Sequence, residues 1–297
     1  MVSPYIVERE NGWLQALGFG DFSVFRTFDC GQCFRFEPCE PSHPSHKYEV
    51  EGIAFGKYVR FADGLDGELY IYSSAEDFDS IWCSYLSLDI DYGAVNERIL
   101  SALSGADALH MARAAEASRG IRILRQDSWE ALCSFIISQN NNIPRIKKII
   151  AALCEKYGEK LENGYAFPTP EDLSKAGEEA IFELRTGFRA KYIYDAACKI
   201  STGELLLADV KGANTYEDAE KLLLTIKGVG PKVAACTLLF GFERLSAFPV
   251  DVWIKKVIAN RFENGLDHTL FGDYAGVAQQ YLFYFERYVE NSTVIDK

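Results

Sequence analysis

The chain has 297 residues, of which 48% are hydrophobic and 25% charged, and its formal net charge at pH 7 is −12. This globular composition argues against wholesale disorder, and a typical size of about 150 residues per domain predicts two domains. No apolar run approaches the roughly 18 residues of a membrane span, and the N-terminus has neither a basic nor an apolar signal region, so we expect a cytoplasmic protein.

The acidic residues are unevenly distributed along the chain. Residues 61–97 contain no Lys or Arg and nine acids: Asp63, Asp66, Glu68, Glu76, Asp77, Asp79, Asp89, Asp91 and Glu97. A negative net charge is unusual for a nucleic-acid-binding protein, but net charge governs solubility and non-specific association rather than what one face can bind. We therefore interpret residues 61–97 as a solvated acidic surface.

The eight cysteines include a CxxC pair, Cys30 and Cys33, with Cys39 shortly after it. No second CxxC and no neighbouring His pair completes a set of four ligands, so we predict no metal site. We expect all the cysteines to be reduced, and those on apolar stretches to be buried as small hydrophobic residues.

The first part of the sequence alternates apolar and polar residues as β-strands do. The stretches with this pattern are residues 34–36, 47–51, 58–61 and 69–72. Gly56 and Lys57 predict a turn between two of these strands. We therefore expect an antiparallel β-rich domain over residues 1–90.

From about residue 75 the periodicity becomes helical, which predicts an α+β fold with a helical part over residues 91–297. Asp127 and Glu130 match a capping box that would open a helix over residues 129–137. The other helices whose bounds we predict cover residues 189–200, 216–226, 232–240, 252–262 and 274–289.

A Gly-Val-Gly-Pro-Lys turn joins two apolar helical patterns that together span about residues 216–242. Glycine tolerates positive φ, and Pro231 suits the first position of a helix. Amides at a helix N-terminus bind phosphate oxygens, so Gly228, Val229 and Gly230 are candidates for a DNA-phosphate contact. The alternative is an ordinary corner between two helices, because Gly-Val-Gly alone is weak evidence for phosphate binding.

Two residues in this region are candidates for catalysis. Lys232 would lie in the first turn of its helix, where the positive end of the helix dipole favours the free amine that a nucleophile needs. Asp251 follows Pro249 and Val250 and precedes an apolar helix, so it is a good helix cap. It could also stabilise a cationic sugar transition state, although the cap alone is the simpler interpretation.

These patterns resemble the helix-hairpin-helix DNA glycosylase superfamily, and within it the 8-oxoguanine DNA glycosylase/lyase branch. The first matching motif is Leu-x-x-Ile-x-Gly-Val-Gly-x-Lys from residue 223 together with the later Pro-Val-Asp. The other four occupy residues 31–35, 135–146, 187–192 and 274–283. Five ordered motifs along almost the whole chain are specific, although each is weak alone.

The resemblance implies a bifunctional enzyme that flips 8-oxoguanine out of duplex DNA and removes it, preferably opposite cytosine. Lys232 would form a Schiff base and permit β-elimination, and Asp251 would stabilise the positive charge. The base pocket would comprise Gly31, Cys236, Gln279 and Phe283. The contacts to the opposite base and the wedge would come from Asn140, Arg145, Phe188 and Arg189. For Arg145 and Arg189 a generic phosphate contact is the alternative.

The resemblance also implies damaged double-stranded DNA as the partner, a monomer, and a nucleoid association if the cell is prokaryotic. No cofactor, metal or iron–sulfur cluster is expected, and no Cys follows Cys236. Many eukaryotic members of the family have a phosphate-contacting histidine at the position of Trp253. We therefore do not predict this contact to the DNA backbone. The alternatives are a monofunctional alkylpurine (3-methyladenine-type) glycosylase, whose branch lacks the lysine, and a non-catalytic DNA-binding hairpin module.

Overall fold

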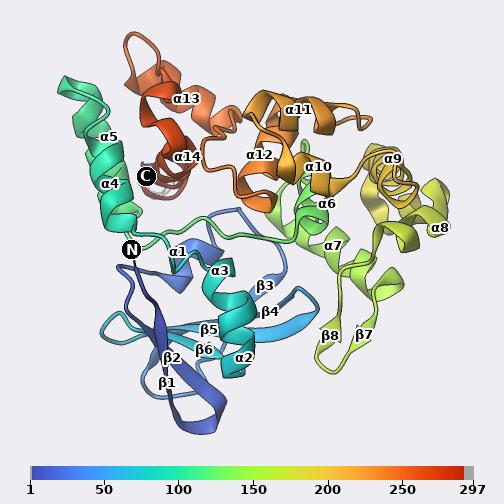
Figure 1. Ribbon diagram of the computed structural model, residues 1–297, viewed down its shortest axis with the longest axis horizontal. Coiled ribbons are helices and arrows are strands. Elements are labelled where there is room, and N and C mark those ends of the chain that lie inside the picture. The colour runs from blue at the N-terminus through green and yellow to red at the C-terminus, as the bar shows by residue number, and fades with distance from the viewer. Residues whose placement is uncertain (1, 291–297) are drawn as a thin grey trace, which may run out of the picture.

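The computed structural model describes residues 2–290 and begins with a six-stranded antiparallel sheet in the order β1-β2-β6-β5-β4-β3 (Figure 1). Its strands are β1 (Tyr5–Glu8), β2 (Trp13–Leu17), β3 (Phe36–Cys39), β4 (His46–Ala54), β5 (Lys57–Gly64) and β6 (Leu69–Tyr72). Val50, Phe61 and Ile71 are paired across three strands and fully buried on the inner face. The expected antiparallel sheet in the N-terminal part of the chain is therefore confirmed.

Two details of the predicted sheet differ from the structure. The third strand begins at Phe36 rather than at residue 34, because Phe34 packs edge-on against Phe135 of the helical part and Arg35 pairs with Glu130. Strands β1 and β2 were not predicted, and β2 shows no alternation because four consecutive residues of it are buried.

Helices make up most of the remaining described chain. They are α1 (Val24–Phe28), α2 (Ala75–Asp77), α3 (Cys83–Tyr85), α4 (Tyr92–Leu100), α5 (Gly105–Ala117), α6 (Ser128–Ser138), α7 (Ile143–Tyr157), α8 (Pro170–Ile181), α9 (Ala190–Ser201), α10 (Leu207–Gly212), α11 (Tyr216–Leu224), α12 (Pro231–Gly241), α13 (Val252–Arg261) and α14 (Ala275–Tyr284). A small hairpin of β7 (Lys160–Leu161) and β8 (Gly164–Tyr165) projects beside α7 (Figure 1).

The expected α+β fold class is confirmed, and α11 and α12 enclose the glycine turn as the sequence predicts. The capping box is only half present. Asp127 accepts a hydrogen bond from the Glu130 amide at 2.9 Å, but the Glu130 carboxylate lies 3.0 Å from Arg35 Nη1 instead of returning to the cap. Met1 and the last part of the expected helical region, residues 291–297, lie outside the described residues.

The buried apolar residues form two clusters, one against the sheet and one among the helices. Cys30 and Phe34 belong to the helical cluster although they come from the N-terminal part of the chain. The turn between them is thereby held against α6 and α14, which positions it for the site described below. Among residues 2–290, no helix combines the length and the apolar character needed to cross a lipid bilayer.

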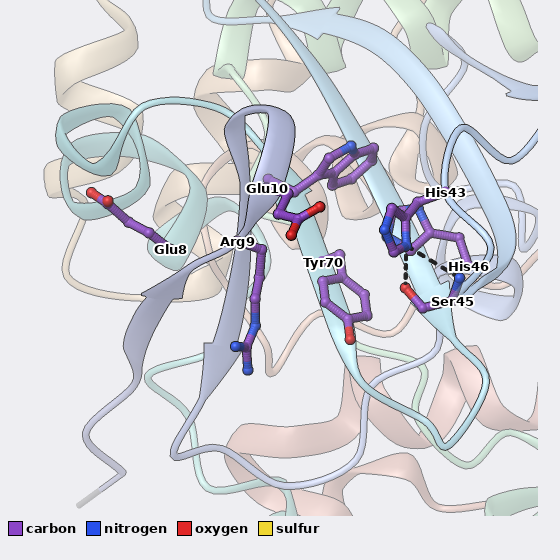
Figure 2. A pocket seen from close by; sticks show the side chains of 8 residues that line it. Glu8, Arg9, Glu10, His43, Ser45, His46 and Tyr70 are labelled. Carbon is purple, nitrogen blue, oxygen red and sulfur yellow. Dashed lines mark hydrogen bonds between the residues drawn. The ribbon is translucent and has the colours of Figure 1, made fainter.

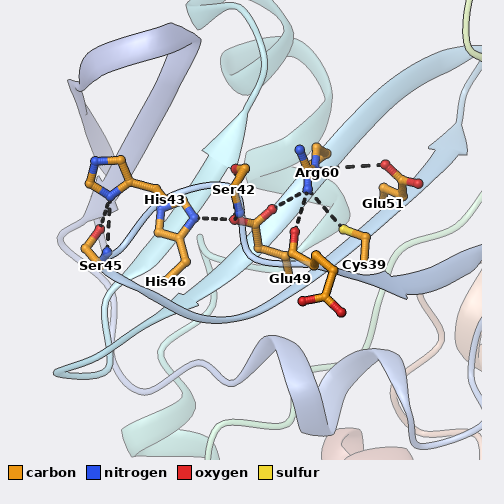
Figure 3. A network of polar contacts seen from close by, with 9 residues as sticks. Cys39, Ser42, His43, Ser45, His46, Glu49, Glu51 and Arg60 are labelled. Atoms are coloured by element: carbon orange, nitrogen blue, oxygen red, sulfur yellow. Dashed lines mark hydrogen bonds and ion pairs between the residues drawn. The ribbon is translucent and has the colours of Figure 1, made fainter.

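The outer face of the sheet carries a buried charge network (Figure 3). Glu49 is fully buried, its Oε1 accepts a hydrogen bond from the Ser42 amide at 2.6 Å, and the same oxygen lies 2.5 Å from His46 Nδ1. Arg60 Nη2 lies 2.6 Å from the other carboxylate oxygen. The network therefore fastens the loop before β4 onto the sheet.

A hollow of about 490 Å³ borders this network (Figure 2). Its lining residues are Glu8, Arg9, Glu10, Trp13, His43, Ser45, His46 and Tyr70. None of them is among the candidate site residues, so the hollow is separate from the site described next.

Candidate active site and DNA-binding groove

Segments far apart in the sequence meet around a small cavity. They are the turn at Cys30 and Gly31, helices α6, α12 and α14, and the segment that leads into α13. The lining residues are Cys30, Gly31, Phe135, Lys232, Cys236, Phe240, Pro249, Asp251, Gln279, Gln280 and Phe283. The structure thus brings together all six residues that were predicted to be catalytic or to form the base pocket.

Lys232 lies in the first turn of α12, directly after Gly230 as N-cap and Pro231. Its Nζ is 5.6 Å from the centroid of the Phe135 ring, and Cys236 lies one turn further along the helix. Burial raises the pKa of the Cys236 thiol, and the nearby Lys232 only partly offsets this effect. The thiol is therefore neutral near pH 7, and the amine of Lys232 shares the cavity with it.

Asp251 is the N-cap of α13, as the sequence predicted. Its Oδ1 accepts hydrogen bonds from the amides of Trp253 and Ile254, both at 2.9 Å. These two bonds fix the carboxylate at the wall of the cavity that also holds Lys232. A fixed carboxylate beside a nucleophilic amine can stabilise positive charge that develops at an atom between them.

The turn at Gly31 is held from both sides. Gly31 has φ +77°, a conformation that favours glycine, and a side chain added there would point toward Phe283 and Ile143. The next residue, Gln32, donates to the carbonyl of Arg122 at 2.9 Å and accepts from the amide of Leu124 at 2.8 Å. The backbone of the turn is therefore rigidly presented to the cavity.

Helix α14 supplies the opposite wall of the cavity. Gln279 is buried, and Phe283 follows four residues later on the same face. Gln280 also lines the cavity, and its Nε2 donates to the carbonyl of Cys30 at 3.0 Å. Sequence reasoning did not single out Gln280, and the only available signal was its position next to Gln279.

The cavity shares five lining residues with a larger groove of about 780 Å³: Gly31, Phe135, Lys232, Asp251 and Phe283. The groove also includes the predicted residues Asn140, Phe188 and Gly230, and it reaches Trp253 and Lys255 on α13 and Arg287 beyond α14. The other predicted residues Arg145, Arg189, Gly228 and Val229 are outside its lining.

Arg189 is 2% exposed and engaged with the protein backbone. Its Nε donates to the carbonyl of Gln139 at 2.9 Å, and its Nη1 donates to that of Thr186 at 3.2 Å. Burial and the nearby Arg145 lower the pKa of Arg189. In this conformation Arg189 braces the turn that precedes α7.

The neighbours of Arg189 are more accessible. Phe188 is 47% exposed, and the Arg189 guanidinium lies over its ring, 4.5 Å from the centroid. Arg145 is exposed at the start of α7 and donates to the carbonyl of Arg185 at 3.3 Å. Asn140 is exposed, with φ +48°. This region therefore presents one ring, one guanidinium and one amide to the solvent.

The glycine turn packs tightly against α9. Gly228 has φ +78°, and a Cβ at this position would lie 2.4 Å from atoms of the Tyr192 ring. The amide of Lys227 donates to Asp195 Oδ2 at 2.8 Å. A Cβ added at Gly230, by contrast, would have no described atom within 4 Å apart from atoms of Gly230 and its two chain neighbours. The hairpin is fixed on one side and open on the side that faces the groove.

The groove lining carries more positive than negative charge. Lys232, Lys255 and Arg287 oppose Asp251, and the amine of Lys256 lies 4.6 Å from the centroid of the Trp253 ring. Within residues 2–290, no group of three or more His, Cys, Asp or Glu side chains is arranged to hold a metal ion. The groove therefore suits a polyanion, despite the acidic chain as a whole.

Comparison with known families divides the chain into two matches. Residues 18–132 match the N-terminal domain of 8-oxoguanine DNA glycosylase, and residues 133–265 match the HhH-GPD superfamily of base excision DNA repair proteins. In Saccharomyces cerevisiae, an N-glycosylase/DNA lyase is 38% identical over 160 residues, which are 49% of this chain and 43% of the relative. The chain spans about half the length of the curated relatives it matches.

Solved structures align over nearly the whole chain. The 8-oxoguanine glycosylase/lyase of Clostridium acetobutylicum, in complex with double-stranded DNA that contains cytosine opposite 8-oxoG, is 37% identical with a TM-score of 0.85. That alignment covers 97% of this chain and 98% of the other. The structure of MBOgg1 with a low-affinity DNA ligand is also 37% identical, with a TM-score of 0.84 and coverage of 96% and 98%.

Proposed function

The chain belongs to the 8-oxoguanine DNA glycosylase family of the HhH-GPD superfamily, and from this premise we propose that it excises 8-oxoguanine from duplex DNA and cleaves the strand at the abasic site. The observation that carries the proposal is the cavity in which Lys232, Asp251, Gly31 and Gln279 meet. The named activities of the relatives agree with it.

The chemistry follows from the two groups at the cavity wall. Nζ of Lys232 attacks C1′ of the flipped nucleotide, and the bond to the base breaks, with its electron pair leaving on the base. Asp251 stabilises the cationic character of the sugar in the transition state. The sugar ring then opens as the C1′–O4′ bond breaks and a proton passes from Nζ to O4′, which leaves a Schiff base between Nζ and C1′. Loss of a C2′ proton then expels the 3′ phosphate by β-elimination.

Recognition of the lesion depends on one hydrogen. 8-Oxoguanine has an N7–H donor, which the carbonyl of Gly31 accepts, whereas guanine would oppose that carbonyl with an acceptor. An unpaired buried polar group costs about 1–3 kcal/mol, so this contact alone favours 8-oxoguanine over guanine by only about 10- to 100-fold. Gln279 reads the Watson–Crick edge, and Phe283 and Cys236 pack against the faces of the base.

The remaining residues hold the rest of the duplex. Asn140, Arg145 and Arg189 contact the opposite cytosine, and Phe188 fills the space that the flipped base leaves. For Arg189 this requires the guanidinium to turn from the backbone carbonyls that it now contacts. The amides of Gly228, Val229 and Gly230 bind phosphates.

We further propose that the protein acts as a monomer on damaged duplex DNA. We place it in the cytoplasm and, in a prokaryotic cell, at the nucleoid. The mechanism requires neither a metal nor an organic cofactor.

A single assay separates this function from its alternatives. Duplexes with 8-oxoguanine opposite each of the four bases are incubated with the protein, and base release and strand cleavage are measured with and without hot alkali. The proposal predicts release of 8-oxoguanine with cleavage that needs no alkali. Cleavage only after alkali would indicate a monofunctional glycosylase, and binding without base release would indicate a non-catalytic module.

A further inference from the structure

One buried hydrogen bond joins α14 to the turn at Gly31. Gln280 Nε2 donates to the carbonyl of Cys30 at 3.0 Å, and these residues are 3% and 1% exposed. They are 250 positions apart in the sequence, so the bond links a segment near the N-terminus to one near the C-terminus. Burial makes such a bond stronger and its loss more costly than at the surface.

The bond completes the support of Gly31. Gln32 is fastened to the segment at Arg122 and Leu124, whereas Cys30 is fastened to α14 through Gln280. Gly31 lies between these two anchors, so its carbonyl is oriented by both. Among the hydrogen bonds that the described residues make with Cys30 and Gln32, the bond from Gln280 is the one that ties the turn to the helix carrying Gln279 and Phe283.

We propose that Gln280 is a positioning residue for base recognition, because it sets the separation between the Gly31 carbonyl and the side chains of Gln279 and Phe283. This inference rests on the proposed function. The carbonyl and Gln279 hold different edges of the same base, so their separation must match the size of the base. An error of about 1 Å in such a site is enough to lower a rate strongly.

The same helix offers a matched control. The Tyr281 hydroxyl donates to Asn96 Oδ1 at 2.9 Å, and Tyr281 lies outside the cavity lining. Tyr281→Phe therefore removes a hydrogen bond of similar length from α14 without touching the turn. Gln280→Met keeps the length of the side chain and removes its amide, and Gln280→Glu replaces the donor with an oxygen that repels the Cys30 carbonyl.

The test compares two reactions of the full chain. Single-turnover release of 8-oxoguanine opposite cytosine depends on base recognition, whereas cleavage of a preformed abasic site opposite cytosine does not. In Gln280→Met we expect base release to slow about tenfold, and more in Gln280→Glu, with abasic-site cleavage within twofold of the unaltered protein. Tyr281→Phe should change neither rate by more than about twofold.

Binding supplies a second readout. With Lys232→Gln added to prevent reaction, Gln280→Met should reduce the ratio of affinities for 8-oxoguanine and guanine duplexes about three- to tenfold. An unchanged ratio and base-release rate, or an equal loss of both reactions, would overturn the positioning role. If the unaltered protein releases no 8-oxoguanine, the proposed function fails as well. If the unaltered protein releases 8-oxoguanine and the Gln280 variants behave as it does, only this inference is overturned.

Discussion

Arg189 Nη2 donates a hydrogen bond to the backbone carbonyl of Asn140 at 2.9 Å. Both residues are proposed to contact the base opposite the lesion, yet here one supports the other. Arg189 is buried, whereas Arg145 is exposed at the start of α7. Replacing the two arginines should therefore have different effects on protein stability.

The opposite base provides the first prediction. We expect excision of 8-oxoguanine to be about tenfold or more faster opposite cytosine than opposite adenine, since adenine leaves the guanidinium donors unpaired. Arg145→Met should reduce this preference and leave thermal stability unchanged. Arg189→Ala should reduce it and also lower the free energy of unfolding by about 1–3 kcal/mol, because buried carbonyls lose their donor.

Single-turnover rates against all four opposite bases, with a melting curve for each variant, test this pair. Arg113→Met on the exposed face of α5 is a suitable control, because it lies outside the groove. Equal rates opposite cytosine and adenine in the unaltered protein would reduce both arginines to phosphate contacts.

Asp251 allows its charge to be separated from its role as a helix cap. Asparagine caps helices about as well as aspartate, so Asp251→Asn should retain the α13 cap and lesion binding. Loss of the carboxylate charge should slow single-turnover excision about a hundredfold. Asp127→Asn at the cap of α6 is the control and should leave the rate nearly unchanged. A near-normal rate in Asp251→Asn would leave Asp251 only as a cap.

The expected solvated acidic surface of residues 61–97 does not include Asp63, which is half-buried and accepts hydrogen bonds from the amides of Val24 and Phe25 at 2.7 and 2.9 Å. The acids of this segment should have little influence on lesion binding. None of its nine acids lines the groove, and Asp77 pairs with Lys57 of the sheet at 3.3 Å. Affinity should nevertheless fall steeply with salt, despite a pI of about 4.9, because the groove cations and amides replace counterions on DNA. Asp77→Asn with Asp79→Asn should change lesion affinity less than about twofold. A large change that persists at high salt would place this surface in the interface.

The charge network on the outer face of the sheet should contribute to stability. Glu49→Ala leaves Arg60 and His46 without their shared carboxylate, and removal of one partner of a buried ion pair costs about 3–5 kcal/mol. Glu51→Ala is the control, because its side chain is 44% exposed and 3.9 Å from Arg60 Nε. Its cost should be below about 1 kcal/mol. Urea unfolding of both variants measures the difference, and equal losses would show that burial of Glu49 does not matter.

Local chemistry explains what the sequence could predict. Gly228 lies in the turn of the hairpin and Pro231 begins its second helix, so the bounds of both helices were predicted close to those observed. Asp251 was expected to be a helix cap because it precedes an apolar helix, and it is one. The prediction that the six catalytic and base-pocket residues share one cavity came only from the family resemblance, because no sequence spacing relates Gly31 to Phe283.

Long-range contacts explain what the sequence could not predict. The hydrogen bond from Gln280 to Cys30 and the ion pair between Glu130 and Arg35 depend on how distant segments pack together. Arg189 could not be placed from its motif, because a guanidinium suits a base edge and a backbone carbonyl equally well. Strand β2 was missed because it is buried along most of its length.

Lys232 is the proposed nucleophile, and sodium borohydride trapping on a duplex with 8-oxoguanine opposite cytosine tests this role most directly. Borohydride reduces the Schiff base to a stable amine, so the unaltered protein should become covalently attached to DNA. Lys232→Gln should bind the duplex, because the hairpin amides remain, and should form no adduct and cleave no strand. A borohydride-stable adduct in Lys232→Gln would contradict the account, because another amine would then be the nucleophile.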